Sequence, residues 1–305
     1  MPRLKIGTRG SPLAIAQARE ARDRLMAAHG LGEDEIEIVT IATTGDRIRD
    51  RPLTEVGGKG MFTKEIEEAL LAGIIDFAVH SMKDMPARLP DGLVISTLLP
   101  REDAREAFLS PVAQSIAELP HGATIGSSSV RRTAQLLRLR PDVKTVLFRG
   151  NVETRLRKLA AGEAHATFLA AAGLNRLGLA GKITALVPMD VMLPAIAQGA
   201  IGLEIRKNDA TTRALLAPIN HPETQIAVSC ERAFLAALDG SCRTPLAGHA
   251  KPQDGVLHFR GHALTLDGVH CFETTRQGSP ADAERVGRDA GEEVKARGGA
   301  LIVFS

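Results

Sequence analysis

The sequence predicts an α/β protein with two doubly wound α/β lobes and a small α+β domain at the C-terminal end. Its 305 residues are about twice the ~150 residues of a typical domain, so we expect two or three domains. Strand and helix patterns alternate through about the first two hundred residues, which is typical of sheets with helices on both faces. From His221 the pattern changes to one long helix followed by glycine-punctuated strands, which predicts the third domain.

The first lobe is expected over residues 1–99 and 200–217. Ser11 is a favoured N-cap and Pro12 fits the first helical position, so together they predict a helix that runs to about His29. Strands separated by helices imply parallel pairing. The other expected elements are strands at 4–6, 35–42, 77–80 and 93–99, a helix over 61–72, and a strand at 200–205 that returns to the first sheet.

The second lobe is expected over residues 105–193 and repeats the pattern of the first. Its predicted elements are strands at 124–126, 144–148 and 166–170 and helices over 128–140 and 152–161. The α+β domain is expected over residues 222–305. It should contain a helix from residue 221, antiparallel strands at 256–266 and 270–275, a helix over 280–297 and a final strand at 301–304.

Composition argues against several classes of protein. The net charge is only +2 and Trp and Tyr are absent, which argues against nucleic-acid binding. No run approaches the ~18 apolar residues of a membrane span. The N-terminal segment lacks the apolar core of a signal peptide, and the three cysteines fit no zinc or CxxC pattern. We therefore expect a reduced, cytoplasmic setting.

Arginine outnumbers lysine 28 to 10, which reflects either genomic base composition or a need for guanidinium groups that grip carboxylates or phosphates. Three predicted helix starts favour the second interpretation, because a helix N-terminus binds anions and ligands of open α/β sheets lie at the carboxyl ends of strands. One such start alone would be explained by capping and surface salt bridges. Three together predict a cleft for a polyanion, with Arg9 and Ser11, then Ser127–Ser129 with Arg131 and Arg132, then Arg149, Asn151 and Arg155.

Asp84 is the one carboxylate expected in this cationic cleft. It lies in the segment His80–Pro86, which follows a buried strand, and Lys83 beside it adds a cation. The carboxylate either pairs with a neighbouring Lys or Arg, or faces a cation or N–H group that forms during a reaction.

A long polar segment, Thr43–Gly60, interrupts the first lobe. It carries many charges, including Asp46 and Lys59, and glycines that can act as hinges. Long irregular segments inside compact domains are usually functional. We expect a lid, with a plain solvated loop as the alternative.

The cysteines differ in their surroundings. Cys230 and Cys271 fall in apolar helix and strand patterns, so both are expected to be buried and inert. Cys242 lies in a loop signal beside Arg243, which favours its thiolate. Histidines gather in the third domain and are interpreted as exposed strand residues, so no metal is expected; they are His249, His258, His262 and His270.

Seven motifs in order resemble the porphobilinogen deaminase (hydroxymethylbilane synthase) family over essentially the whole chain. The motifs are Thr8–Ala14, Val56–Phe62, Ala78–Asp84, Gly126–Arg132, Arg149–Arg155, Pro194–Gly199 and Gly240–Pro245.

The resemblance implies a transferase that joins four porphobilinogen molecules head to tail, with loss of ammonia, into hydroxymethylbilane. It implies one dipyrromethane cofactor bound by a thioether to Cys242, and a catalytic Asp84 that contacts pyrrole nitrogens and stabilises positive charge. It further implies a monomer whose only partner is the substrate. The cofactor carboxylates would be held by Lys83, Ser129, Arg131, Arg132 and Arg155, the incoming substrate and chain carboxylates by Arg9, Ser11, Arg149 and Arg176, and Phe62 and the Lys59 loop would lie over the site.

Three positions depart from the family pattern. Glu55 stands where lysine is frequent, so the lid would carry less positive charge. Ser241 replaces a usual glycine before the cysteine. Ala197 replaces another and is expected to stiffen the crossing segment.

The alternative function is a non-catalytic anion-binding protein with a two-lobed binding-protein fold, as solute receptors have. The N-terminal sequence argues against it, and Cys242 would have no role there.

Overall fold

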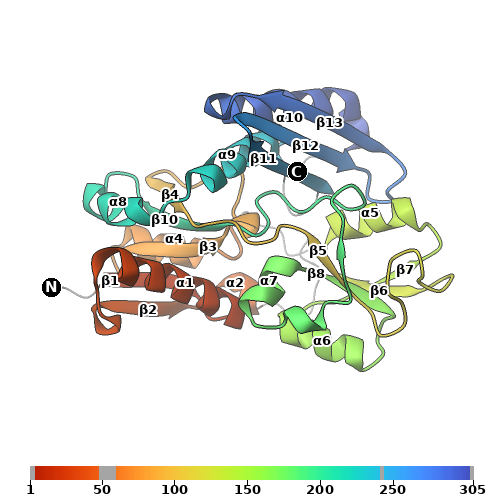
Figure 1. Ribbon diagram of the computed structural model, residues 1–305, viewed down its shortest axis with the longest axis horizontal. Coiled ribbons are helices and arrows are strands. Elements are labelled where there is room, and N and C mark those ends of the chain that lie inside the picture. Colours follow the sequence, from red (N-terminus) through yellow and green to blue (C-terminus); the bar gives the residue numbers. More distant parts are fainter. Residues whose placement is uncertain (1–3, 48–59, 241–243, 303–305) are drawn as a thin grey trace. The chain divides into compact units, whose positions relative to one another are not determined.

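The computed structural model describes residues 4–47, 60–240 and 244–302 (Figure 1). These residues form two compact units, which are described separately. The first contains residues 4–47, 60–102 and 199–225, and the second contains 103–198, 226–240 and 244–302. The expected division into three domains stays a prediction.

A five-stranded mixed sheet organises the first unit, in the order β2-β1-β3-β10-β4. Strands β2 and β3 pair parallel to β1, as expected, and β10 returns to the sheet, which is confirmed. Its pairing with β3 and β4 is antiparallel, so the expectation of parallel strands alone is wrong. No crossover helix sets its direction, because it enters from a distant part of the chain. The strands are β1 (Leu4–Arg9), β2 (Ile36–Ile41), β3 (Phe77–Ser81), β4 (Leu93–Leu98) and β10 (Ile201–Arg206).

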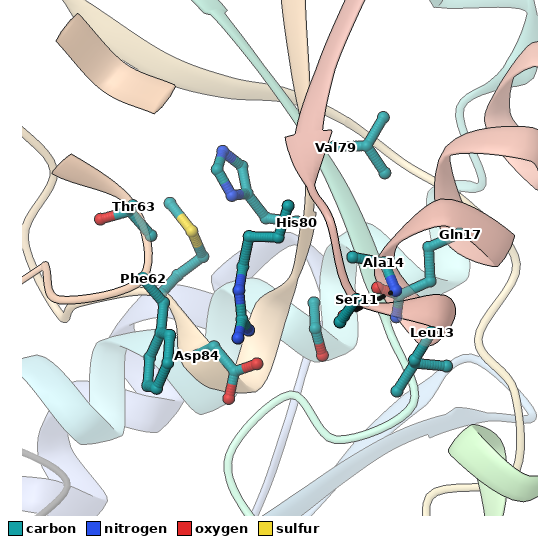
Figure 2. Close-up of a pocket in the computed structure, with 12 residues that line it drawn as sticks. Ser11, Leu13, Ala14, Gln17, Phe62, Thr63, Val79, His80 and Asp84 are labelled. Carbon is teal, nitrogen blue, oxygen red and sulfur yellow. Dashed lines mark hydrogen bonds between the residues drawn. The ribbon is translucent and has the colours of Figure 1, made fainter. Parts of the chain in front are cut away.

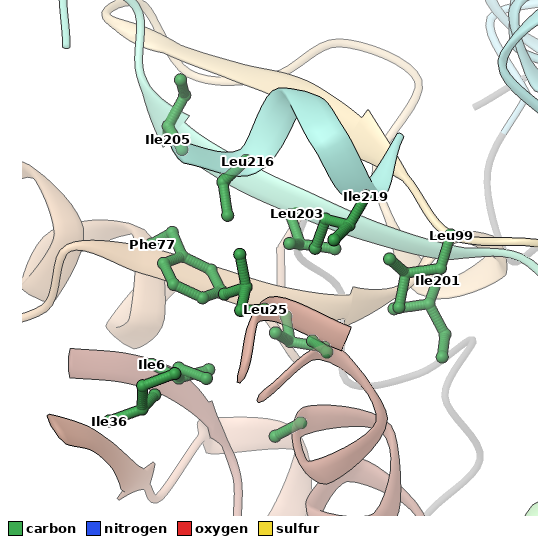
Figure 3. Packing of buried hydrophobic residues seen from close by; sticks show 13 residues of the cluster. Ile6, Leu25, Ile36, Phe77, Leu99, Ile201, Leu203, Ile205, Leu216 and Ile219 are labelled. Atoms are coloured by element: carbon green, nitrogen blue, oxygen red, sulfur yellow. The ribbon is translucent and has the colours of Figure 1, made fainter. Parts of the chain in front are cut away.

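Helices cover both faces of this sheet. Helix α1 starts as predicted, since the Ser11 hydroxyl accepts a hydrogen bond from the Ala14 N–H. Its apolar side meets one face of the sheet, where Leu25 packs with Ile6 and Phe77 (Figure 3). Helix α4 packs on the other face. The helices of this unit are α1 (Pro12–His29), α2 (Thr44–Arg47), α4 (Lys64–Leu71) and α8 (Ala210–Leu216), with short 3-10 turns at Glu33–Glu35, Met82–Asp84 and Ala217–Ile219.

The second unit repeats this sheet plan, in the order β7-β6-β8-β5-β9. Strands β7 and β8 pair parallel to β6, and β5 lies antiparallel between β8 and β9. Helix α5 packs on one face and α6 and α7 on the other. The elements are β5 (Glu106–Leu109), β6 (Thr124–Ser127), α5 (Val130–Leu139), β7 (Lys144–Leu147), α6 (Val152–Ala160), β8 (Ala166–Ala170), α7 (Ala171–Arg176), a 3-10 turn at Ala180–Lys182 and β9 (Ala185–Val187).

A three-stranded antiparallel sheet, β11-β12-β13, follows helix α9. Asp254 and Gly255 form the two-residue hairpin between β11 and β12, and both have positive φ, as Asp-Gly hairpin turns require. Helix α10 packs against β12 and β13. The elements are α9 (Pro222–Ala237), β11 (Leu246–Gln253), β12 (Val256–Leu264), β13 (Cys271–Gly278), a 3-10 turn at Pro280–Asp282, α10 (Ala283–Gly298) and a 3-10 turn at Gly299–Leu301.

The expected final strand at 301–304 is wrong for the residues that the structure describes. Leu301 closes a 3-10 turn and Ile302 lies in a bend, while 303 and 304 are outside the described residues. Gly299 has a positive φ at the end of α10 and redirects the chain there. The sequence analysis also missed β5, β9 and β11.

Ala197 adopts a left-handed backbone conformation, with φ of 57°. This conformation costs an L-residue roughly 1–2 kcal/mol and is easily adopted by glycine, the usual family residue here. The Glu231 carboxylate accepts a hydrogen bond of 2.5 Å from the Ala197 N–H, which holds the strained residue in place. Stiffening of this segment stays a prediction.

Helices α9 and α10 approach closely at Gly287. A methyl group at this position would overlap the Cys230 carbonyl oxygen. We expect Gly287→Ala to lower the free energy of unfolding by about 1–3 kcal/mol, the usual effect of overpacking. The control is Gly181→Ala, whose methyl would meet no atom within 4 Å. Denaturant titration measures both, and equal stability of the two variants would contradict the packing.

Candidate active site

A pocket in the first unit lies at the carboxyl ends of β1 and β3, where α1 begins (Figure 2). Parallel strands bring these ends to one edge of the sheet, where ligands of α/β proteins bind. The expected residues Arg9, Ser11, Phe62 and Asp84 all line it. The rest of the lining is Leu13, Ala14, Gln17, Thr63, Val79, His80, Ser81 and Met85.

Arg9 and Phe62 contact each other in this pocket. The guanidinium carbon of Arg9 lies 4.3 Å from the centre of the Phe62 ring, which is a cation–π contact. The ring therefore orients a guanidinium at the N-terminus of α1, where the helix dipole adds positive potential. This arrangement places positive charge on one side of the pocket.

Asp84 is exposed at the end of the 3-10 turn that follows β3. Its carboxylate makes no hydrogen bond or ion pair with any residue that the structure describes. The structural alternative, an ion pair with a neighbouring Lys or Arg, thus finds no support in this part of the chain. Lys83, in the same turn, is half-buried and has interaction partners of its own.

A buried polar pair that sequence reasoning missed supports the pocket floor. His80 Nε2 lies 3.0 Å from Glu204 Oε2, and both side chains are buried. Glu67 on α4 is also buried, and burial raises the pKa of its carboxyl. The sequence feature that could have revealed these residues is a glutamate at a core-facing position, as Glu204 is in β10 and Glu67 is in α4.

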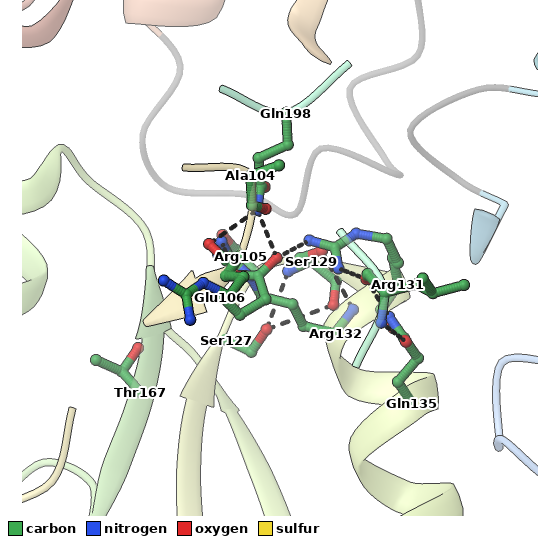
Figure 4. Close-up of polar contacts among 12 residues, drawn as sticks. Ala104, Arg105, Glu106, Ser127, Ser129, Arg131, Arg132, Gln135, Thr167 and Gln198 are labelled. Carbon is green, nitrogen blue, oxygen red and sulfur yellow. Dashed lines mark hydrogen bonds and ion pairs between the residues drawn. The ribbon is translucent and has the colours of Figure 1, made fainter. Parts of the chain in front are cut away.

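In the second unit, Arg131 and Arg132 meet a third residue that the sequence analysis missed, Glu106 on β5 (Figure 4). Arg131 Nη2 donates to Glu106 Oε1 at 2.6 Å, and Arg132 Nε donates to Oε2 at 2.9 Å. Glu106 is fully buried and both guanidinium groups are nearly so. The two arginines, expected to bind a ligand's carboxylates, therefore hold a carboxylate of the protein.

Gln198 belongs to the same cluster, and the Leu193 carbonyl accepts a further hydrogen bond from Arg131. Gln198 Nε2 donates to Glu106 Oε1 at 3.1 Å, and Arg131 Nη1 donates to the Leu193 carbonyl at 2.8 Å. One carboxylate faces two guanidinium groups, so the Glu106 cluster (Glu106, Arg131, Arg132 and Gln198) keeps an excess positive charge. That charge lies at the N-terminus of α5, where Ser129 is the cap and accepts from the Arg132 N–H.

The third expected helix start is also formed. The Asn151 side chain caps α6 through the Thr154 N–H at 2.9 Å. Arg155 on this helix donates to the Ser128 hydroxyl at 3.0 Å, so it joins the starts of α5 and α6. Arg149 and Arg176 are half-buried, before α6 and at the end of α7, and both have interaction partners.

Several predicted residues lie outside the description. Cys242, Lys59, Glu55 and Ser241 belong to segments that the structure does not describe, and only the backbone of Asp46 is placed, in α2. Their expected roles stay predictions. Among the described helices, none combines the length and apolarity that a membrane span requires.

Two sequence-family models match the chain. Residues 4–214 match "Porphobilinogen deaminase, dipyromethane cofactor binding domain", and residues 225–296 match the C-terminal domain of the same family. The chain belongs to the porphobilinogen deaminase family.

Similar curated proteins carry the family's name. A porphobilinogen deaminase of Nitrobacter winogradskyi is 57% identical over 96% of this chain and 93% of its own length. One from Paracoccus denitrificans is 58% identical over 96% and 94%. Among solved structures, a periplasmic substrate-binding protein of Coxiella burnetii is 15% identical over 73% of this chain and 94% of its own, with a TM-score of 0.44.

The Glu106 cluster predicts a large loss of stability when its carboxylate is removed. Glu106→Gln leaves two buried guanidinium groups without an anion, and breaking a buried ion pair costs about 3–5 kcal/mol. Glu163→Gln is the matched control, because Glu163 is exposed and lies 3.9 Å from Lys158, a type of pair worth at most about 1 kcal/mol. Similar denaturation midpoints for the two variants would show that the cluster contributes little.

Replacement of the buried Glu67 by glutamine is expected to raise the stability of the fold in a pH-dependent way. Burial raises the pKa of its carboxyl, so the folded state binds the proton more tightly than the unfolded state, and the ionised form at pH 7 destabilises the fold. Glu67→Gln should therefore unfold at a higher temperature than wild type at pH 7. The gain should shrink as the pH falls toward the unfolded value of about 4.3.

The exposed neighbour provides the control for this prediction. Glu68→Gln removes an exposed carboxylate from the same helix and should leave the melting temperature at pH 7 close to that of wild type. A Glu67→Gln variant with the same pH profile as wild type would contradict the assignment.

Proposed function

We propose that Asp84, the pocket residues of the first unit and the cations of the second unit carry out the reaction of this family. That reaction joins four porphobilinogen molecules head to tail, with loss of ammonia, into the linear tetrapyrrole hydroxymethylbilane. It is a transferase reaction of tetrapyrrole, porphyrin and heme biosynthesis. Each pyrrole ring carries an acetate and a propionate, so the product chain is a polyanion.

The donors of the second unit fit a dipyrromethane cofactor. Its carboxylates require charge-assisted hydrogen bonds, and the Glu106 cluster has two guanidinium groups for one internal carboxylate. Ser129 and Arg155 add donors at two helix N-termini. When bound, the cofactor supplies a covalently anchored primer. We assign its carboxylates to Lys83, Ser129, Arg131, Arg132 and Arg155, and its thioether to Cys242.

The substrate and the growing chain are assigned to a second set of donors. In the first unit, Arg9 is oriented by Phe62 and lies beside the capped N-terminus of α1, where carboxylates are stabilised. We also assign Arg149 and Arg176 to the carboxylates of the substrate and the growing chain. The set is Arg9, Ser11, Phe62, Arg149 and Arg176, with Asp46 and Lys59 as lid residues.

The carboxylate of Asp84, which has no partner among the described residues, is the observation that carries this proposal. In a pocket with Arg9, a carboxylate repels anions, so it needs a chemical purpose or a partner. Described residues give it no partner. When ammonia leaves the substrate, positive charge develops on the ring, and a fixed carboxylate stabilises that charge. Asp84 would also accept a hydrogen bond from a pyrrole N–H and so orient the ring.

A non-catalytic anion-binding protein is the less favoured function. Anion binding alone explains the arginines, but it does not explain the family relationship over both matched regions. It also does not explain a carboxylate in the pocket that no described residue pairs with. We further propose a cytoplasmic monomer that binds no nucleic acid. The net charge of +2 and the absence of Trp and Tyr support the last point.

Asp84→Asn should assemble little product although its shape is nearly unchanged. An amide cannot offset positive charge, and removal of one preorganised electrostatic contact typically lowers the rate by about 10²–10³. Porphobilinogen consumption measures the rate, and Asp91→Asn, at an exposed position after the site, is the control. Asp84→Asn with most of the wild-type rate would show that the residue is structural.

A further inference from the structure

Three potential metal ligands meet on the C-terminal sheet, apart from the residues discussed above. His262 lies on β12, and Cys271 and Glu273 lie on β13. His262 pairs directly with Glu273 in the antiparallel register, and Cys271 is two residues before Glu273. All three side chains therefore project from one face of the sheet. Their ligand atoms all lie within 4.8 Å of one another.

The expectation that the histidines of this region are exposed is wrong for His262, which is buried. Its side chain is 5% exposed, and neither ring nitrogen has a hydrogen-bond partner among the described residues. Buried polar groups in folded proteins almost always have a partner. A coordinated cation would provide the partner that the described residues do not.

Cys271 and Glu273 remain accessible to an ion. The sequence analysis predicted that Cys271 is buried, but the side chain is only half-buried. Glu273 is exposed. Cys271 Sγ lies 3.8 Å from Glu273 Oε1, and Arg260 Nη2 lies 3.9 Å from the same oxygen. Both contacts are long, so small side-chain rotations can redirect these groups.

We propose that His262, Cys271 and Glu273 bind one zinc ion, with water as the fourth ligand. Imidazole nitrogen and thiolate sulfur suit zinc, whereas magnesium and calcium prefer oxygen ligands. Zinc–ligand bonds of about 2.0–2.3 Å place tetrahedral ligand atoms roughly 3.3–3.8 Å apart, which the rotations above achieve. As the zinc–sulfur bond forms, the Cys271 thiol proton passes to solvent. Thiolate and carboxylate together balance the charge of the ion.

The ion would cross-link β12 and β13 close to the loop that joins them. Arg138 of α5 donates a hydrogen bond of 3.2 Å to the Val269 carbonyl in this loop, and Gly268 approaches the backbone of the same helix. Helix α5 also carries Arg131 and Arg132. Zinc would therefore stabilise the packing of the β12–β13 hairpin on α5. This proposal is independent of the proposed function.

Cobalt(II) titration of the full-length protein, purified with its cofactor and freed of metal by a chelator, tests the site. Wild type should bind one equivalent and develop a thiolate-to-cobalt absorption band, which zinc then displaces. Cys271→Ser should lose the band, and Glu273→Gln and His262→Gln should bind at least about tenfold more weakly. His258→Gln is the matched control, since His258 is an exposed histidine on the same strand and should leave binding unchanged.

Thermal unfolding provides the second measurement. Zinc should raise the melting temperature of wild type and of His258→Gln but not of Cys271→Ser. Should the buried His262→Gln fail to fold, the exposed Glu273→Gln still decides the question. A thiolate band that survives in Cys271→Ser, or wild type that binds no stoichiometric cobalt, would overturn the proposal.

Discussion

A buried carboxylate shared by two guanidinium groups is the interaction on which the second unit depends. Glu106 is on β5, the antiparallel strand of that sheet, and it joins the strand to α5 through Arg131 and Arg132. Removal of these charges from water is costly and is offset only when every group is well paired. Formation of the cluster therefore requires β5, α5 and the segment with Gln198 to be in place together. The N-terminus of α5, the expected anion-binding element, is positioned as a consequence.

The first unit also buries a glutamate against a basic side chain, but the pair is different. Its antiparallel strand, β10, also carries a fully buried glutamate, Glu204, which meets His80 beneath the pocket. Because His80 precedes Asp84 on the same segment, this pair fixes the strand end from which the Asp84 turn departs. In each unit, then, a fully buried glutamate on the antiparallel strand pairs with a buried basic side chain.

Local signals in the sequence were sufficient for most elements. Ser11 and Pro12 marked the start of α1, and the helix-start residues Ser129 and Asn151 are indeed caps. The direction of β10 and the existence of β5 were not predicted, because pairing between distant strands leaves no local trace. Glu106 and Glu204 were missed for a related reason. A glutamate within a short apolar strand looks like an edge residue until its partner, far along the chain, is known.

The grouping of Arg9, Phe62 and Asp84 in one pocket was predictable from the sequence, and the burial of Arg131 and Arg132 was not. Arg9, Phe62 and Asp84 share one pocket as expected, since strand ends of parallel neighbours meet. Arg131 and Arg132 were expected to be available to a ligand, yet they are buried against Glu106. Because the Glu106 carboxylate faces two guanidinium groups, the cluster keeps an excess of positive charge. The start of α5 therefore carries the net charge of a buried cluster rather than single exposed cations.

Intact mass of the purified full-length protein tests the central claim most directly. A chain that builds a tetrapyrrole on its own anchored primer should be heavier than its sequence by one dipyrromethane. Added porphobilinogen should increase the mass in steps of one pyrrole ring, with one ammonia released at each step. Cys242→Ser should lack the added mass, and Cys230→Ser should keep it. Wild type with the mass of the bare chain, or Cys242→Ser with the full addition, would contradict the account.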